Sequence, residues 1–204
     1  MTRDRWRRLL ESLALPPDED TYERLVEGYS QKHRKYHNVT HLEDCLAQLD
    51  GARHLADEPD EVEIALWFHD AIYEPYASDN EVKSAEWAWA FLTEQGGGDE
   101  ERAGRVRDHI LATLHDGRAE SNDSTLLVDI DLSILGADED EYRRFEAAVR
   151  EEYRWVPRFV YRKKRRAILE SFLVRQQIYV HDLFRQRLEE RARGNLEAAI
   201  VALA

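Results

Sequence analysis

Residues 59–70 read PDEVEIALWFHD and combine three signals. Pro59 suits the first turn of a helix, and a run of apolar residues then leads from Val62 to Phe68. The run ends at His69 and Asp70, which puts an imidazole and a carboxylate at the edge of a core. Either group is costly to bury unless it is paired or coordinated, and a divalent metal ion would account for both. The stretch therefore predicts a buried helix whose end carries chemistry.

Most of the remaining chain also shows helical spacing of its apolar residues. Such faces are formed by Trp6, Leu9, Leu10 and Leu13, by Tyr22, Leu25, Val26 and Tyr29, and by Tyr142, Phe145, Val149 and Tyr153. Capping boxes at Thr40 with Glu43 and at Ser78 with Glu81 predict two helix starts, and the glycines at 96–98 predict a helix end. No strand alternation stands out, so we expect an all-α protein.

Residues 126–135 are the one ambiguous segment. Their β-branched content permits a strand, but Leu127, Asp131 and Leu135 recur at i, i+4 and i+8. We favour a helix ended by Gly136.

Composition sets limits on the class of protein. The chain has 204 residues, 43% of them hydrophobic and 35% charged, which suits one globular domain with a sizeable core. No apolar run approaches the roughly 18 residues that span a bilayer, and no signal-peptide core follows the basic residues 3–8. We expect a cytoplasmic protein with no membrane contact. The single cysteine, Cys45, excludes an internal disulfide and a multi-cysteine zinc site, so a metal would need His and carboxylate ligands.

The net charge of −13 makes nucleic acid an unlikely partner, because a field of that sign repels phosphate backbones. A small phosphorylated substrate remains compatible, since a bound cation can reverse the field inside a pocket. The sequence does not determine the oligomeric state, and a homo-oligomer is compatible with it.

Four separate residues offer metal ligands: His41, His69, Asp70 and Asp131. They are far apart along the chain, so only a folded helical bundle could bring them together. Imidazole and carboxylate ligands suit one divalent ion among Mn, Mg, Fe, Co, Ni and Zn. Such an ion can lower the pKa of a bound water and stabilise charge on a phosphoryl group.

The order of these residues resembles the H…HD…D signature of the HD superfamily of metal-dependent phosphohydrolases. Longer blocks resemble a bacterial subgroup of predicted HD phosphohydrolases: 36–41 (YHNVTH), 67–73 (WFHDAIY), 79–81 (DNE) with Ser84 and Ala85, 131–136 (DLSILG) and 190–196 (ERARGNL). The resemblance implies one all-α HD-type domain over 1–204, with core motifs at 36–136 and C-terminal helices at 138–204.

The resemblance also implies the metal ligands, which would be His41, His69, Asp70 and Asp131. Asp129 is an alternative to Asp131; in a helix the two point roughly 200° apart, and the matching register favours Asp131. Some HD enzymes bind a second metal through extra histidines.

His109 and His115 are the candidates for such extra ligands. Glu74 and Asp79 follow the His-Asp pair closely, and either could act as a general base in a hydrolase. An ordinary turn residue and a helix cap are the alternatives for these two carboxylates.

Arg34, Lys35 and His37 precede the first ligand and could bind an anionic substrate. For Arg34 and Lys35, plain surface charges are the alternative, and His33 is best interpreted as a surface residue. The basic run at 162–166 (RKKRR) could steer phosphate, although a solvated helix face is the preferred interpretation.

The ligand set and the resemblance together imply a phosphohydrolase that uses a metal-activated water, and the resemblance alone implies that its substrate is a nucleotide or another small phosphate ester. The alternative is an HD-fold module that binds metal or nucleotide without turnover. An oxygenase with two metals ranks last, because it needs more ligands than the sequence assigns.

Overall fold

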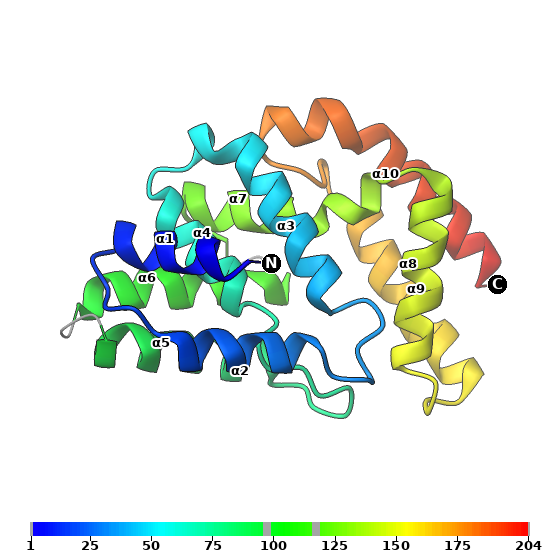
Figure 1. Ribbon diagram of the computed structural model, residues 1–204. Helices are drawn as coiled ribbons and strands as arrows, with labels where there is room; N and C mark the ends of the chain where they lie inside the picture. Colours follow the sequence, from blue (N-terminus) through cyan, green and yellow to red (C-terminus); the bar gives the residue numbers. More distant parts are fainter. Residues whose placement is uncertain (1, 96–98, 116–118, 204) are drawn as a thin grey trace. The chain divides into compact units, whose positions relative to one another are not determined.

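The computed structural model describes residues 2–95, 99–115 and 119–203, and every regular element in these ranges is a helix (Figure 1). The all-α prediction is confirmed. The helix end predicted at residues 96–98 lies outside the described residues. Contacts divide the chain into two compact units, Met1–Ile130 and Asp131–Ala204. The single domain over 1–204 stays a prediction.

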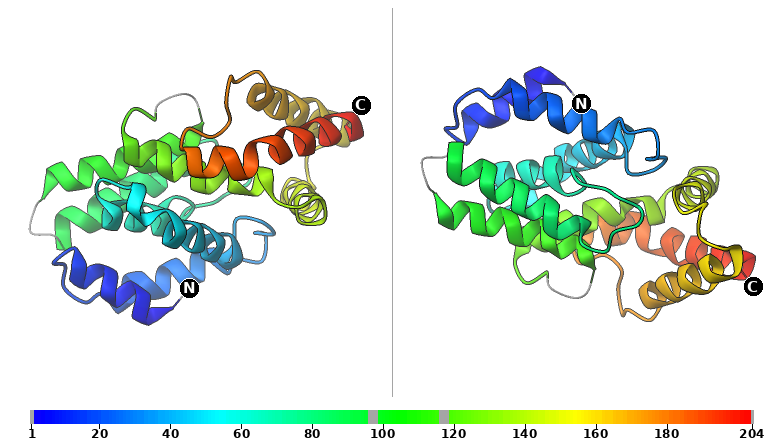
Figure 2. Two further views of the ribbon diagram at one scale, coloured as in Figure 1. Left: turned by 90° about the horizontal axis from the view of Figure 1, so that it is seen from above. Right: turned by 90° about the horizontal axis from the view of Figure 1, so that it is seen from below.

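The first unit contains α1 to α7, and Figure 2 gives two further views of them. Their bounds are α1 Arg3–Ser12, α2 Glu19–Tyr29, α3 Val39–Ala52, α4 Pro59–Phe68, α5 Asn80–Gln95, α6 Glu100–Leu111 and α7 Asn122–Asp131, with 3₁₀ turns at Arg53–Leu55 and Ala112–Leu114. Helix α4 contacts α1, α3, α5 and α6, and every residue from Glu61 to Phe68 is buried. A helix buried on all sides belongs inside a core, so the predicted buried helix is confirmed, and the chemical role of its end stays a prediction.

Two carboxylates interrupt the apolar surface of α4, and both are neutralised by arginines. Glu61 accepts two hydrogen bonds from Arg105, at 2.7 and 2.8 Å. Glu63 pairs with Arg5 at 2.8 Å and with Arg53 at 2.7 Å. Their pairing makes the burial of these charges tolerable, because an unpaired buried carboxylate would be strongly destabilising.

The start of α4 is anchored by a residue of α7. The carboxylate of Asp123 accepts hydrogen bonds from the backbone N–H groups of Asp57 (2.7 Å) and Glu58 (2.8 Å). Pro59 occupies the first turn, as expected.

The two predicted capping boxes are both displaced. Helix α3 begins two residues earlier than expected, because Asn38 accepts a hydrogen bond of 2.9 Å from the backbone N–H of Thr40 and so caps the helix itself. Helix α5 begins at Asn80, and its first backbone hydrogen bond runs from Lys83 to the carbonyl of Asp79. Asp79 therefore takes the capping position predicted for Ser78.

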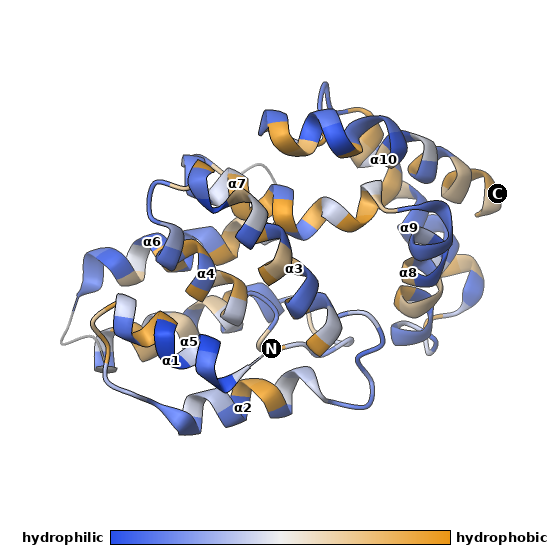
Figure 3. Cartoon of the chain, turned by 45° about the horizontal axis from the view of Figure 1, so that its top comes forward, coloured by the Kyte–Doolittle hydropathy of each residue, from blue (hydrophilic) through white to orange (hydrophobic). Residues whose placement is uncertain are grey.

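The second unit contains the 3₁₀ turn η3 Leu132–Gly136 and the helices α8 Glu139–Glu152, α9 Arg158–Leu173 and α10 Asp182–Ala202. Residues 126–135 are helical, as favoured, and end in η3. Gly136 lets η3 approach α10 closely, since a Cβ at this position would lie 2.5 Å from the Cβ of Leu188. Asn195 of α10 donates to the carbonyl of Leu135 (2.8 Å) and ties the two elements together. Figure 3 colours the helices by hydropathy, and the basic run at 162–166 lies in α9 with Lys163, Lys164 and Arg166 exposed.

No helix among the described residues has the length and apolar character needed to cross a membrane.

Candidate metal centre

Two imidazoles and a carboxylate converge at the junction of α3 and α4. His41 lies in the first turn of α3, and His69 and Asp70 directly follow α4. The Nε2 atoms of the two histidines are 3.1 Å apart. Oδ2 of Asp70 lies 3.2 Å from Nε2 of His69 and 3.5 Å from Nε2 of His41. Three ligand atoms thus form a small triangle.

A backbone contact fixes the orientation of the His69 ring. Its Nδ1 lies 2.7 Å from the carbonyl oxygen of Leu66, one turn earlier in α4. A carbonyl can only accept, so Nδ1 carries the hydrogen and donates it. In the neutral ring Nε2 is then the atom with the free lone pair, and it points at His41 and Asp70. This is the usual way in which a metal-binding histidine is held.

The charge of Asp70 is favoured by its neighbours. Burial raises the pKa of this carboxyl, but the electrostatic influence of His69, His37 and His41 outweighs it. The pKa therefore lies well below its usual range, and Asp70 is ionised at neutral pH. An ionised carboxylate beside two imidazoles is a set of donors for a cation.

The separations in the triangle match those of ligands on one ion. Nitrogen and oxygen ligands lie about 2.0–2.2 Å from Zn²⁺, so neighbouring ligand atoms are about 3.0–3.5 Å apart. The measured distances between His41, His69 and Asp70 run from 3.1 to 3.5 Å. The residues present fit a divalent metal ion.

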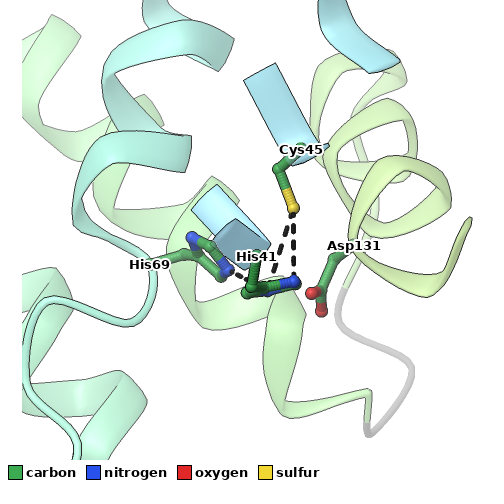
Figure 4. A group of neighbouring side chains, drawn as sticks. All are labelled: His41, Cys45, His69 and Asp131. Atoms are coloured by element: carbon green, nitrogen blue, oxygen red, sulfur yellow. Dashed lines mark hydrogen bonds between the residues drawn. The ribbon is translucent and has the colours of Figure 1, made fainter. Parts of the chain in front are cut away.

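Two further side chains join the histidines (Figure 4). One ligand atom from each of His41, Cys45, His69 and Asp131 lies within 4.8 Å of the others, and this group could bind a metal ion. Asp131 is the last residue of α7, and that helix carries it to the group. Asp129 is wholly buried in the same helix and is not a member of the group. The contribution of Cys45 was missed, although its place one helical turn after His41 was a usable signal.

Arg34 holds the turn that carries the His-Asp pair. Its guanidinium is buried and donates to the carbonyl oxygens of Asp70 (2.5 Å), Ala71 (2.9 Å) and His37 (3.1 Å). Gly28 of α2 packs against the same turn, since a Cβ there would lie 3.1 Å from the carbonyl oxygen of Ala71. Arg34 is thus a positioning residue, and its contact with a substrate stays a prediction.

His37 lies beside the triangle, whereas Lys35 faces solvent. The His37 ring stacks on Tyr73, with centroids 4.3 Å apart, and its charge helps to lower the pKa of Asp70. Lys35 is exposed and lines a depression of about 480 Å³ in which Lys32 also lies. The expectation of a surface position for His33 holds only in part, because this half-buried ring contacts the carbonyl of Tyr73 at 2.9 Å.

The two carboxylates expected to be catalytic are both exposed. The backbone of Glu74 is pinned by Asn80, which accepts from its N–H at 3.0 Å and donates to its carbonyl at 3.1 Å. Asp79 pairs with Lys83 at 2.9 Å. No described contact links Glu74 or Asp79 to the triangle, and their catalytic role stays a prediction.

Glu81 is a carboxylate that the sequence did not single out as functional. It lies in the first turn of α5, three residues before Ser84, whose hydroxyl binds the backbone of Ile72 just after the His-Asp pair. Burial raises the pKa of Glu81, and the negative charge of Asp70 raises it further, while His115 and His37 lower it. The Ser84 contact holds the first turns of α5 beside the segment that follows the His-Asp pair.

The two histidines considered for a second metal have different surroundings. His109 is buried, and its Nδ1 contacts the hydroxyl of Ser124 at 2.8 Å. Ser124 lies seven residues before Asp131 in α7, about 10 Å along the helix axis. His109 is not a member of the ligand group around His41, and its role as a second-metal ligand stays a prediction. His115 is coupled to Glu81 and has a left-handed backbone conformation, with φ of 56°, but it is not part of the ligand group.

No protein-family model matches this chain, and no curated protein or solved structure is significantly similar to it. A function for this chain is therefore inferred from the residues of the site.

Proposed function

We propose that this protein is a metal-dependent phosphohydrolase that acts on a nucleotide or another small phosphate ester. The observation that carries the proposal is the triangle formed by Nε2 of His41, Nε2 of His69 and Oδ2 of Asp70, with sides of 3.1 to 3.5 Å. Asp131 belongs to a second grouping with the same two histidines and Cys45, which does not include Asp70. The divalent ion would be Mn, Mg, Fe, Co, Ni or Zn.

When bound, such an ion supplies an activated water and stabilises negative charge on the phosphoryl group. The chain's own residues prepare the site for it. The carbonyl of Leu66 keeps the proton of His69 on Nδ1, and Arg34 holds the backbone of Asp70. Glu81, whose pKa is raised, is the carboxyl best suited to hold a proton near the substrate.

The proposal includes the partner, the location and the self-association expected from the sequence. The partner is a small phosphorylated molecule, because the net charge of −13 disfavours nucleic acid. A cytoplasmic location and self-association stay predictions.

The test is a phosphate-release screen over nucleotides and small phosphomonoesters with each metal in turn. The inactive reference is the double variant His69→Ala, Asp70→Ala. A matched control is His54→Ala, Asp108→Ala, which removes the same two residue types from exposed positions. We expect phosphate release by the parent and by the control, and none by the inactive reference.

Equal turnover in all three proteins would overturn the proposal. Turnover in none of them, with one metal still bound per parent chain, would favour the binding module without turnover.

A further inference from the structure

We propose that Cys45 ligates the metal of this centre through its sulfur, and that this ligand biases the site toward Zn²⁺, Co²⁺ or Fe²⁺ over Mg²⁺ and Mn²⁺. The inference rests on the metal centre proposed above, but not on phosphate hydrolysis. It concerns which ion the chain selects.

The sulfur lies within 4.8 Å of ligand atoms of His41 and His69. Cys45 lies four residues after His41 in α3, so both side chains project from the same face of the helix. Sγ is 3.8 Å from Nδ1 and 3.8 Å from Nε2 of His41. Zn–S bonds of about 2.3 Å and Zn–N bonds of about 2.0–2.1 Å separate neighbouring sulfur and nitrogen ligands by about 3.1–3.6 Å. Both observed distances exceed this range, and a sulfur equally far from the two ring nitrogens does not lie on the Nε2 side of the ring, so ligation requires the Cys45 side chain to rotate toward Nε2.

The surroundings of Cys45 are unlike those of a cysteine that merely fills a core. A buried free cysteine usually behaves as a small hydrophobic residue. Here the thiol is 2% exposed, yet it faces the ring nitrogens of His41 and belongs to a group with His69 and Asp131. Polar neighbours that are themselves metal ligands give this sulfur a chemical role.

Sulfur ligation changes the expected metal. Mg²⁺ and Mn²⁺ prefer carboxylate, carbonyl and water oxygens, whereas thiolate and imidazole suit Zn²⁺ and other borderline ions. On ligation the thiol releases its proton to solvent and binds as a thiolate. An ion bound by His41, Cys45 and His69 would have two nitrogens and one sulfur, which disfavours the harder ions.

Cobalt spectroscopy tests the inference directly. Chelator-stripped protein is titrated with Co²⁺, and the near-ultraviolet region is followed for thiolate-to-cobalt charge transfer. Cys45 is the only cysteine of the chain, so any such band has a single source. The expected result is a band that saturates at one Co²⁺ per chain in the parent and in the control His54→Ala, and that is absent in Cys45→Ser and Cys45→Ala.

Competition between metals is the second readout. Removing the sulfur should lower Zn²⁺ affinity by about tenfold or more while changing Mn²⁺ affinity much less. Far-ultraviolet circular dichroism verifies that both variants are folded. The charge-transfer band is measured in the parent protein itself, so a folding defect in a variant cannot affect that result.

Visible cobalt absorption without charge transfer in the parent, or an equal loss of Zn²⁺ and Mn²⁺ affinity in the variants, would overturn the role of Cys45. Either result would leave the hydrolase proposal standing if phosphate release persisted. If the parent shows the charge-transfer band but cleaves no phosphate ester, Cys45 is a metal ligand and the proposed phosphohydrolase function is wrong.

Discussion

The guanidinium of Arg34 donates a hydrogen bond of 2.5 Å to the backbone carbonyl of Asp70. The same side chain binds the carbonyl of Ala71 at 2.9 Å, so a charged group that sequence analysis offered to a substrate is buried in the protein instead. Arg34 thus holds the backbone of a proposed metal ligand without being a ligand itself. Residues that orient ligands in this way affect metal affinity.

Replacing Arg34 should therefore weaken metal binding without removing a ligand. We expect Arg34→Met to lower the affinity for the divalent ion by about 10- to 100-fold, because the turn carrying Asp70 loses its anchor. Equilibrium competition with a metal indicator measures this. Lys35→Met is the matched control, since Lys35 is the exposed neighbour. Equal affinities for the two variants would contradict the positioning role.

Glu81 should matter to turnover more than the two exposed carboxylates. Its pKa is raised by burial and by Asp70, so it retains its proton to higher pH than an ordinary glutamate. We expect Glu81→Gln to lower kcat by about 100-fold or more, the scale of general acid–base catalysis, with little change in metal affinity. Glu74→Gln and Asp79→Asn are the controls. If either control lost as much activity as Glu81→Gln, the assignment to Glu81 would fail.

Substitution of Gly136 should lower the stability of the protein, whereas substitution of Gly194 should not. A Cβ at Gly136 would lie 2.5 Å from the Cβ of Leu188 and 2.8 Å from its carbonyl oxygen. Gly136→Ala should lower the free energy of unfolding by about 1–3 kcal/mol, because η3 and α10 must move apart. Gly194 lies within α10 with nothing within 4 Å of its Cβ position, so Gly194→Ala should stabilise the protein by about 0.5–1 kcal/mol. Urea denaturation of both variants provides the comparison, and equal effects would refute the close approach.

His109 should make the protein less stable as the pH falls below 6.5. Burial lowers the pKa of His109 from 6.5, although nearby acids, with Asp123 first, partly oppose it. Above pH 6.5 the ring is largely neutral in both states. Below pH 6.5 the unfolded chain binds the proton more readily than the folded chain, so the free energy of unfolding decreases, by at most about 1.4 kcal/mol per pH unit.

The variant His109→Asn should lose this part of the pH dependence. Denaturation curves recorded from pH 7.5 to pH 5, about the range in which a histidine titrates, measure the difference. His54→Asn removes an exposed histidine and should retain the slope of the parent. A parent slope that persists in His109→Asn would assign the titration to another group.

The sequence was most informative where local pattern and burial agree. The apolar run before His69 and the proline at its start predicted α4 correctly, because one buried helix satisfies both signals. Helix starts were less accurate, since the Thr40 capping box was predicted to begin α3 and Asn38 caps that helix instead.

The sequence predicted candidate ligands one by one, but not the contacts that join them. The roles of Arg34 and Cys45 depend on which backbone carbonyls and ring nitrogens the fold brings to them, and no local pattern encodes those contacts. Spacing still offered a partial signal, because Cys45 follows His41 by one helical turn.

Metal stoichiometry tests the central claim most directly. Chelator-stripped parent protein and the variant His69→Ala, Asp70→Ala are equilibrated with each divalent ion, and bound metal is counted per chain. We predict one tightly bound ion per parent chain and none in the variant. Equal binding by both proteins, or no binding by the parent, would contradict the metal centre.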